Sequence, residues 1–169
     1  MVKEYRNLRI WCALGFMLSF YASYVEIKAE LDTNYKAFCD ISEKISCTKA
    51  FSSRFGKGFG ITGLVLGDDS KLNPPNGVIG IFFYTLLFLM SSSNNYAVCV
   101  LELFLCSLAN VLSVYLSFLL YFVLNDLCIV CVSIYLVNFF CFLECWKNYK
   151  RNWLDGVYKT QSINLNKID

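Results

Sequence analysis

The sequence predicts an all-α integral membrane protein: a four-transmembrane-helix bundle with one large loop between helices 1 and 2. Its residues are 57% hydrophobic, with a mean hydropathy of +0.49, against roughly 45 to 50% apolar residues in soluble domains. Four apolar runs are long enough to count as membrane spans, at about 8–25, 77–92, 96–124 and 127–146. We therefore expect a single membrane domain, 1–169, with a polar loop at 26–76 and a cytosolic tail at 147–169.

The first apolar run favours a retained helix over a cleaved signal peptide. Lys3, Arg6 and Arg9 resemble the basic start of a signal. However, no convincing small-x-small cleavage site precedes the acidic Glu26.

The loop contains a glycine-rich stretch at 55–60. It lacks the G-x-x-x-x-G-K-[ST] spacing of a phosphate-binding loop, so nucleotide binding is not expected. Because the mostly apolar residues 61–67 follow it, we interpret the stretch as a short interfacial segment, 55–67, that dips into the edge of the bilayer.

Four spans place two cysteine pairs on the same face of the membrane. An even number of crossings puts both termini on one side and the 26–76 loop on the other, together with the short break at 125–126. Cys39 and Cys47 lie in the loop, while Cys128 and Cys131 open the fourth span. Basic residues crowd the outer ends of the first and fourth spans, which predicts cytosolic termini and a lumenal loop.

The Cys128-x-x-Cys131 motif is the strongest candidate for chemistry. Its thiols lie one helical turn apart, at a helix N-terminus that favours a thiolate, the nucleophile of disulfide exchange. The alternative is inert helix packing. Its position beside a second cysteine pair favours the redox interpretation.

Cys39 and Cys47 allow two interpretations. A static structural disulfide is one. The other is a relay that carries electrons to a membrane-embedded centre through mixed disulfides. A zinc site is not expected, because the C-x7-C spacing is unusual for zinc and the chain has no histidine.

The remaining composition excludes several functions. Five other cysteines lie inside apolar runs and are assigned to packing: Cys12, Cys99, Cys106, Cys141 and Cys145. A net charge of +2 without a long basic run argues against a nucleic-acid partner. We expect no metal and no tightly bound cofactor.

An aromatic-rich pocket beside the Cys128–Cys131 motif would suit a flat, lipid-soluble two-electron acceptor such as a quinone. Asn76 and Tyr135 are candidates to hydrogen-bond its oxygens. The alternatives are a helix-entry cap for Asn76 and an ordinary interfacial tyrosine for Tyr135.

Several motifs together resemble the vitamin K epoxide reductase family, which comprises the reductase and its "like" paralogue. They are Cys39-Asp40, Ile45-Ser46-Cys47, Phe51 to Gly60, Asn76, Phe83-Tyr84, Ser113 to Leu116 and Cys128-Ile129-Val130-Cys131. The resemblance covers nearly all of residues 5–150. It implies a four-helix protein of the endoplasmic reticulum membrane that reduces vitamin K 2,3-epoxide to quinone and quinone to hydroquinone, in support of gamma-glutamyl carboxylation.

The resemblance also implies roles and partners. Cys131 would face the substrate, Cys128 would exchange with Cys47, and Cys39 with Cys47 would form the relay. Asn76 and Tyr135 match substrate hydrogen-bonding positions, and Phe51 and Phe83 match apolar pocket positions. Implied partners are membrane lipid, the vitamin K quinone and epoxide, a lumenal thioredoxin-like thiol donor and coumarin-type inhibitors.

Two residues depart from the reductase pattern. Ile134 stands where the vertebrate reductase has a threonine, and Phe55 replaces a loop tryptophan. Both bear on pocket shape and on coumarin sensitivity. The 63–67 region and the Asn73-Pro74-Pro75-Asn76 turn look closer to the paralogue.

Two other functions remain open from the sequence. A quinone-linked protein disulfide-forming oxidoreductase would run the same chemistry with electrons passing from protein thiols to quinone. A non-enzymatic tetraspan membrane protein would explain Cys39 and Cys47 as a static disulfide but would leave Cys128 and Cys131 as coincidence.

Overall fold

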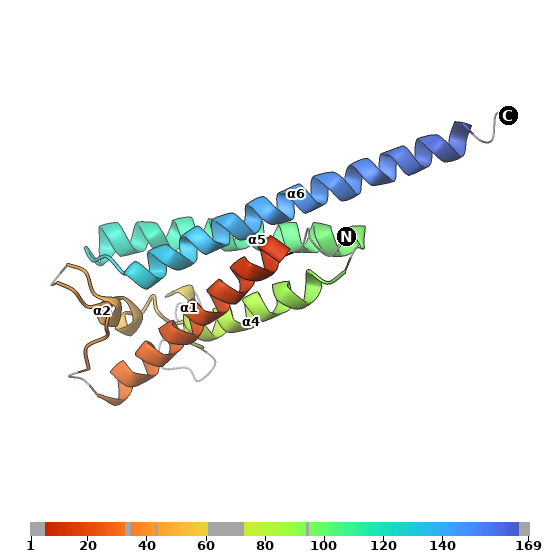
Figure 1. The fold of residues 1–169 in the computed structure, drawn as a ribbon. Coiled ribbons are helices and arrows are strands. Elements are labelled where there is room, and N and C mark those ends of the chain that lie inside the picture. Colours follow the sequence, from red (N-terminus) through yellow and green to blue (C-terminus); the bar gives the residue numbers. More distant parts are fainter. Residues whose placement is uncertain (1–5, 33–34, 43, 61–72, 94, 166–169) are drawn as a thin grey trace.

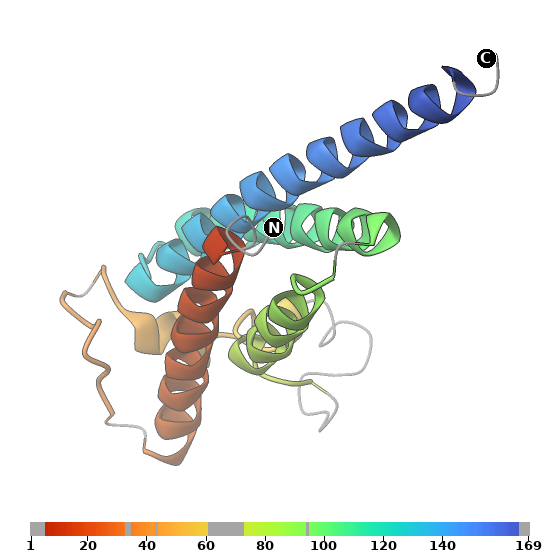
Figure 2. The ribbon, with the colours of Figure 1, turned by 45° about the vertical axis from the view of Figure 1, so that its right-hand side comes forward.

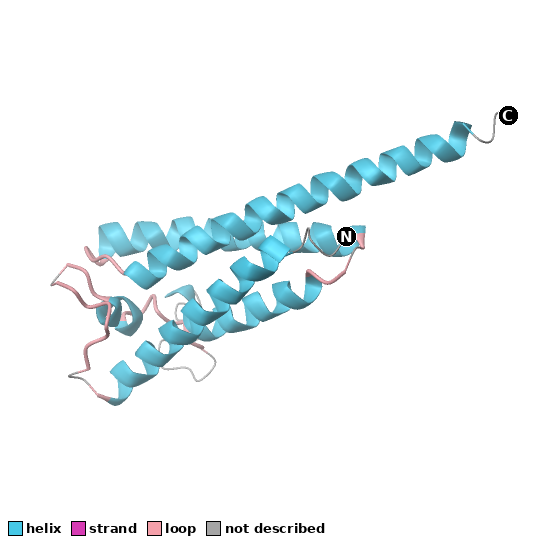
Figure 3. Cartoon of the chain, viewed as in Figure 1, coloured by secondary structure: helices cyan, strands magenta, loops and turns pink. Residues whose placement is uncertain are grey.

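Helices account for all the regular secondary structure that the structure describes (Figure 3). The computed structural model describes residues 6–32, 35–42, 44–60, 73–93 and 95–165. Its long helices are α1 (Arg6–Leu31), α4 (Asn76–Met90), α5 (Tyr96–Phe118) and α6 (Ile129–Leu165). The short ones are α2 (Cys47–Ser52), η1 (Gly58–Gly60) and the π-helical η2 (Leu119–Val123). The prediction of an all-helical protein is confirmed for these residues, whereas residues 61–67 of the predicted interfacial segment lie outside them.

Among the described residues, three helical segments are long and apolar enough to cross a membrane: Arg6–Leu31, Tyr96–Val123 and Ile129–Gly156. The shorter α4 is apolar throughout its 15 residues. At about 1.5 Å per residue it is about 22 Å long, which is less than the roughly 30 Å of a bilayer core.

Local sequence explains where the helices begin and end. The Asn95 side chain caps α5 by accepting a hydrogen bond from the Ala97 amide at 3.0 Å. Asn125 adopts a positive φ of 50°, which turns the chain between η2 and α6. The last apolar run ends at Trp146, but α6 continues to Leu165, beyond the predicted span.

Small residues allow α1 and α4 to approach closely. A Cβ added at Gly15 of α1 would lie 2.3 Å from the Tyr84 ring of α4, and one at Gly80 would lie 2.4 Å from the Ser19 hydroxyl. Close backbone approach of this kind is a main source of helix association in lipid, where burial of apolar surface contributes little.

The long helices pack in an up-and-down arrangement (Figures 1 and 2). α1 packs against α4 and α6, and α5 packs against α6, whereas α4 and α5 contact each other sparsely. Arg9 near the start of α1 donates to the hydroxyls of Ser91 and Ser92, just after α4, at 3.3 and 3.1 Å. The other end of the bundle carries α2 and the start of α6 (Figure 1), so the disulfide loop lies beside the Cys128–Cys131 motif, as the topology predicted.

Candidate active site

A cavity of about 340 Å³ lies inside the bundle at the end that carries the loop. Residues of α1, α4, α5 and α6 form its walls, and residues of α2 and η1 close one end. Its lining is mostly apolar, and it extends between α4 and α5, where the two helices are least tightly packed. Such a space suits an apolar ligand that carries a few polar atoms.

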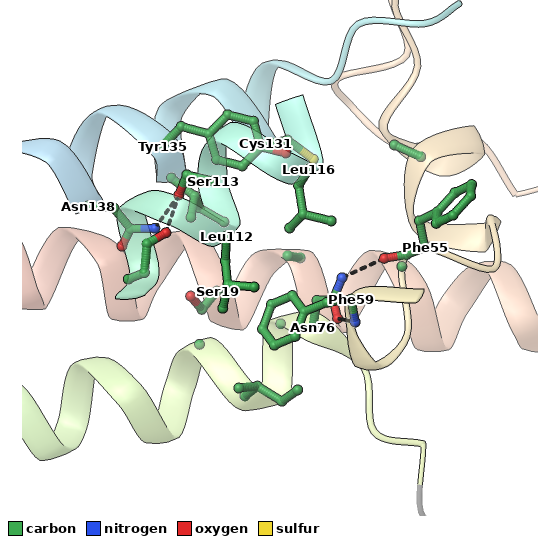
Figure 4. A pocket seen from close by; sticks show the side chains of 18 of the residues that line it. Ser19, Phe55, Phe59, Asn76, Leu112, Ser113, Leu116, Cys131, Tyr135 and Asn138 are labelled. Atoms are coloured by element: carbon green, nitrogen blue, oxygen red, sulfur yellow. Dashed lines mark hydrogen bonds between the residues drawn. The ribbon is translucent and has the colours of Figure 1, made fainter. Parts of the chain in front are cut away.

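One face of α6 supplies the reactive wall of the cavity. Cys131, Tyr135 and Asn138 follow one another at helical spacings of four and three residues, and all three line the cavity (Figure 4). The Tyr135 hydroxyl makes no hydrogen bond to another described residue, so it can donate to or accept from a ligand.

Cys128 is not among the residues that line the cavity, and it caps α6. It directly precedes the helix, its carbonyl accepts the Val132 amide at 3.0 Å, and its Sγ accepts the Cys131 amide at 3.2 Å. This is the geometry of an N-cap residue with sulfur in place of oxygen. The Cys131 amide therefore points at Sγ, at the end of α6 where the helix dipole is positive.

The loop cysteines form a disulfide, Cys39–Cys47. Cys47 and Cys128 are both fully buried in one apolar cluster, against which Cys39 and Cys131 also pack. Cys128 and Cys131 are free thiols. The structure therefore brings all four cysteines together, with the loop pair oxidised and the α6 pair reduced.

Backbone hydrogen bonds hold the loop against the start of α6. The Ser46 amide donates to the Leu127 carbonyl at 3.0 Å, and the Leu127 amide donates to the Lys44 carbonyl at 2.9 Å. The paired loop segment ends directly before Cys47, and the paired segment that leads into α6 ends directly before Cys128. The two cysteines are thus aligned by the backbone itself.

Asp40 organises the disulfide loop, a role that sequence reasoning missed. One carboxylate oxygen accepts from the Ser46 hydroxyl and the Thr48 amide, and the other accepts from the Thr48 hydroxyl and the Ala37 amide. Burial alone would raise the pKa of Asp40, but these hydrogen bonds outweigh it and hold the pKa below its ordinary value. The signal in the sequence was an acid next to Cys39 with Ser46 and Thr48 on either side of Cys47.

Asn76 lines the cavity and also fastens the loop that closes it. Its Oδ1 accepts from the Phe59 amide at 2.7 Å, and its Nδ2 donates to the Phe55 carbonyl at 2.6 Å (Figure 4). Phe59 has a positive φ of 58°, a strained backbone for a residue with a side chain, and the bond from Asn76 holds it there. The alternative prediction of a helix-entry cap is incomplete, because the Asn76 side chain bonds to the loop and not to α4.

Phe51 and Phe83 both line the cavity, from α2 and α4. Phe51 is buried beside Cys47, while the Phe83 ring meets the Tyr84 ring edge-on, with centroids 5.2 Å apart. The two departures noted in the sequence, Phe55 and Ile134, also line this space.

A buried polar network forms the inner end of the cavity, and sequence reasoning did not identify it. The Tyr84 hydroxyl donates to Asn138 Oδ1 at 2.7 Å, and Asn138 Nδ2 donates to the Ser113 hydroxyl at 2.9 Å. The Ser113 hydroxyl bonds onward to the Ala109 carbonyl. The sequence does contain a signal for this network, because Asn138 is a polar residue in an otherwise apolar run and shares the helical face of Cys131 and Tyr135. No cluster of three or more potential metal ligands occurs among the described residues.

Comparison with known proteins identifies the family. The profile of the "Vitamin K epoxide reductase family" matches residues 8–146. "Vitamin K epoxide reductase complex subunit 1" of Mus musculus is 45% identical over 128 residues, which are 75% of this chain and 79% of the relative. The Rattus norvegicus protein of the same name is 43% identical over the same shares of both chains. The chain that forms this cysteine-lined cavity belongs to the vitamin K epoxide reductase family.

Proposed function

We propose that the protein reduces vitamin K 2,3-epoxide to vitamin K quinone, and the quinone to hydroquinone, with thiols as the source of electrons. One observation carries the proposal: Cys131 lines the apolar cavity while Cys128, its partner, is buried beside Cys47. This arrangement gives the motif one thiol for the substrate and one for the relay. By family analogy, the reaction would support the vitamin K cycle of gamma-carboxylation.

The proposed topology has four membrane spans, α1, α4, α5 and α6, with the loop in the lumen of the endoplasmic reticulum and both termini in the cytosol. Close packing of α4 on α1 supports the short helix as a fourth span. The lumen maintains protein disulfides, which agrees with the Cys39–Cys47 bond.

The epoxide reaction begins when the Cys131 thiolate attacks an epoxide-bearing carbon, which opens the ring and leaves a carbon–sulfur bond and an oxyanion. The oxyanion takes a proton. Cys128 Sγ then attacks Cys131 Sγ, the carbon–sulfur bond breaks, and the oxygen of the opened ring leaves as water. The balance is one epoxide and two thiols giving one quinone, one water and one disulfide. Quinone reduction consumes a second pair of thiols and gives hydroquinone and a disulfide.

Tyr135 and Asn76 are the proposed donors to the developing oxyanion. Tyr135 has an uncommitted hydroxyl next to Cys131, and Asn76 keeps a second Nδ2 hydrogen after bonding to the Phe55 carbonyl. The chain has no histidine, so we assign the proton to water or to a cysteine thiol.

The relay returns the α6 pair to its reduced state. The Cys47 thiolate attacks Cys128 Sγ of the Cys128–Cys131 disulfide and releases Cys131 as a thiolate. Cys39 then attacks Cys47 Sγ, which frees Cys128 and forms Cys39–Cys47. The oxidised loop pair with two free thiols on α6 corresponds to the end of this transfer. A lumenal thioredoxin-like protein would next reduce the loop disulfide.

The proposal is tested by measuring epoxide reduction in membranes supplied with dithiothreitol. We expect turnover by the natural protein, none by Cys131→Ala, and retained turnover by Cys39→Ala and Cys47→Ala, because a small dithiol reaches the α6 pair without the relay. Full activity of Cys131→Ala would refute the mechanism. A protein that passes electrons from protein thiols to quinone but leaves the epoxide intact would instead be the disulfide-forming oxidoreductase.

Coumarin-type inhibitors are proposed to occupy the same cavity. Phe55 and Ile134 both line it, so their departure from the reductase pattern would change inhibitor affinity more than it changes turnover.

A further inference from the structure

A second group of cysteines lies beyond the inner end of the cavity, away from the loop and the Cys128–Cys131 motif. Cys12, Cys106, Cys141 and Cys145 are at most 1% exposed and belong to one apolar cluster. Cys106 on α5 and Cys145 on α6 have their Sγ atoms 3.5 Å apart. Two thiols from separate helices are therefore in direct contact.

The relay cannot serve this pair. Cys145 lies 17 residues along the chain from Cys128 (145 − 128 = 17), nearly all of them in α6. At about 1.5 Å per residue, this places the two about 25 Å apart. Thiol–disulfide exchange requires contact between sulfur atoms, so the loop pair and the α6 motif do not reach Cys145.

A buried carboxyl group accompanies the pair. Glu102 is 0% exposed and lies one helical turn before Cys106 on α5. Neither of its carboxyl oxygens has a hydrogen-bond partner within the described part of the chain. Because Cys106 contacts Cys145, this carboxyl lies on the same side of α5 as the thiol pair. An unpartnered carboxyl at this depth is costly, and packing alone does not explain it.

We propose that Cys106 and Cys145 form a second oxidisable dithiol, with Glu102 as the acceptor of the Cys145 proton and a hydroperoxide as the oxidant. The site would be a redox modification site, separate from the proposed turnover of vitamin K. Hydroperoxides fit because they are small, and because some dissolve in lipid and can reach thiols that are sealed from water.

The chemistry balances in two steps. Cys145 gives its proton to Glu102, and the thiolate attacks the terminal peroxide oxygen, which breaks the O–O bond and yields a sulfenic acid. The leaving alkoxide takes the proton from Glu102 and departs as an alcohol, or as water from hydrogen peroxide. Cys106 then attacks the sulfenic sulfur, the disulfide forms, and water leaves. Closing the bond brings the sulfurs from 3.5 Å to about 2.05 Å.

The disulfide would join α5 to α6 directly behind the inner end of the cavity. Asn110 Nδ2 already bridges the Cys106 carbonyl at 2.8 Å and the Asn138 carbonyl at 3.0 Å. Asn138 carries the polar network with Tyr84 and Ser113. Oxidation would thus link α5 and α6 covalently beside the residues that line the inner end of the cavity.

The test uses the full-length protein in lipid nanodiscs, treated with hydrogen peroxide or with cumene hydroperoxide. Remaining thiols are alkylated in denaturant, and chymotryptic peptides are analysed by mass spectrometry. We expect a linked Cys106–Cys145 peptide that is two hydrogens lighter than its separate parts. The linked peptide should be absent from Cys145→Ala and should form at least about tenfold more slowly in Glu102→Gln, which cannot accept the proton.

Cys99→Ser is the matched control, since Cys99 is a buried cysteine on the same face of α5, and the link should form in it at the natural rate. A link with either peroxide supports the proposal. Full alkylation of Cys106 and Cys145 after both treatments, or an unchanged rate in Glu102→Gln, would overturn it. Epoxide reduction by Cys145→Ala should stay intact, so failure here is distinguishable from failure of the proposed function.

Discussion

The two ends of this bundle carry the same reactive group in opposite surroundings. At the loop end, Cys128 accepts an amide hydrogen bond at a helix N-terminus and lies beside Cys47, next to a ligand-sized cavity. At the other end, Cys106 and Cys145 contact each other deep in apolar packing, beside an unpartnered Glu102. The reactivity of a cysteine in this protein therefore depends on its access to a ligand and on its hydrogen-bonding partners, which the number of cysteines does not reveal.

The largest expected effect is a difference in the rate of epoxide reduction between substitutions at the two ends of the bundle. Cys131→Ala should lower epoxide reduction at least about a thousandfold, because the proposed nucleophile is lost. Cys145→Ala should change the same rate by less than about twofold, because Cys145 does not line the cavity and lies about 25 Å along the chain from Cys128. Initial rates with dithiothreitol measure both, and equal losses in the two variants would contradict the division of roles.

A smaller effect is expected from a substitution at Asn76, which holds the loop that closes the cavity. Asn76→Ala removes the bonds to Phe55 and Phe59. Each is worth roughly 0.5 to 1.5 kcal/mol, so we expect the KM for the epoxide to rise about tenfold. The control is Asn95→Ala, which removes a helix cap at the other end and should cost about 1 kcal/mol of stability without moving the KM. An unchanged KM in Asn76→Ala would show that the loop does not need this anchor.

Asp40→Asn tests the loop itself. The change removes the charge that accepts four hydrogen bonds, so the Cys39–Cys47 segment should lose its fixed position against Cys128. We expect turnover driven by a thioredoxin-like donor to fall about fivefold, with little change in turnover driven by dithiothreitol. Asp155→Asn, an exposed acid on α6, serves as the control. Equal losses with both donors would mean that Asp40 supports the whole fold and not the relay.

The smallest expected effect is a pH dependence of the loop. Because the folded protein lowers the pKa of Asp40 below the ordinary 3.8, the stabilisation is full above that value and is lost as the pH falls through the folded pKa. Limited proteolysis of the loop should therefore be constant from pH 7 to about pH 5 and should increase below about pH 4. Asp40→Asn should lack this step. A change in the rate of proteolysis between pH 5 and 7 in the natural protein would show that a titratable group other than Asp40 controls the stability of the loop.

Much of the loop end could be predicted from the sequence. Apolar runs and the polar break at 125–126 indicate the order of the helices, and the predicted four crossings would place Cys39 and Cys47 at the end that carries Cys128, where the structure has them. These features are local or follow from counting, so one sequence is enough to find them.

The far end could not be predicted in the same way. Contact between Cys106 and Cys145 depends on the register of α5 against α6, and side-chain packing over the whole interface sets that register. The same limit hid the bond between Tyr84 and Asn138, which come from helices distant in the chain. Asn76 was recognised as a polar group at a helix entry, but its partners depend on the strained turn at Phe59.

Disulfide trapping distinguishes the two thiols of the motif, of which Cys128 is proposed to exchange with the loop and Cys131 to face the cavity. In a Cys39→Ala, Cys131→Ala double variant, Cys47 and Cys128 are left without their resolving partners. We predict a stable Cys47–Cys128 link on mild oxidation, detected by mass spectrometry, and little link between Cys47 and Cys131 in the reciprocal Cys39→Ala, Cys128→Ala variant. Equal trapping of Cys131, or no link to Cys128, would contradict the assignment.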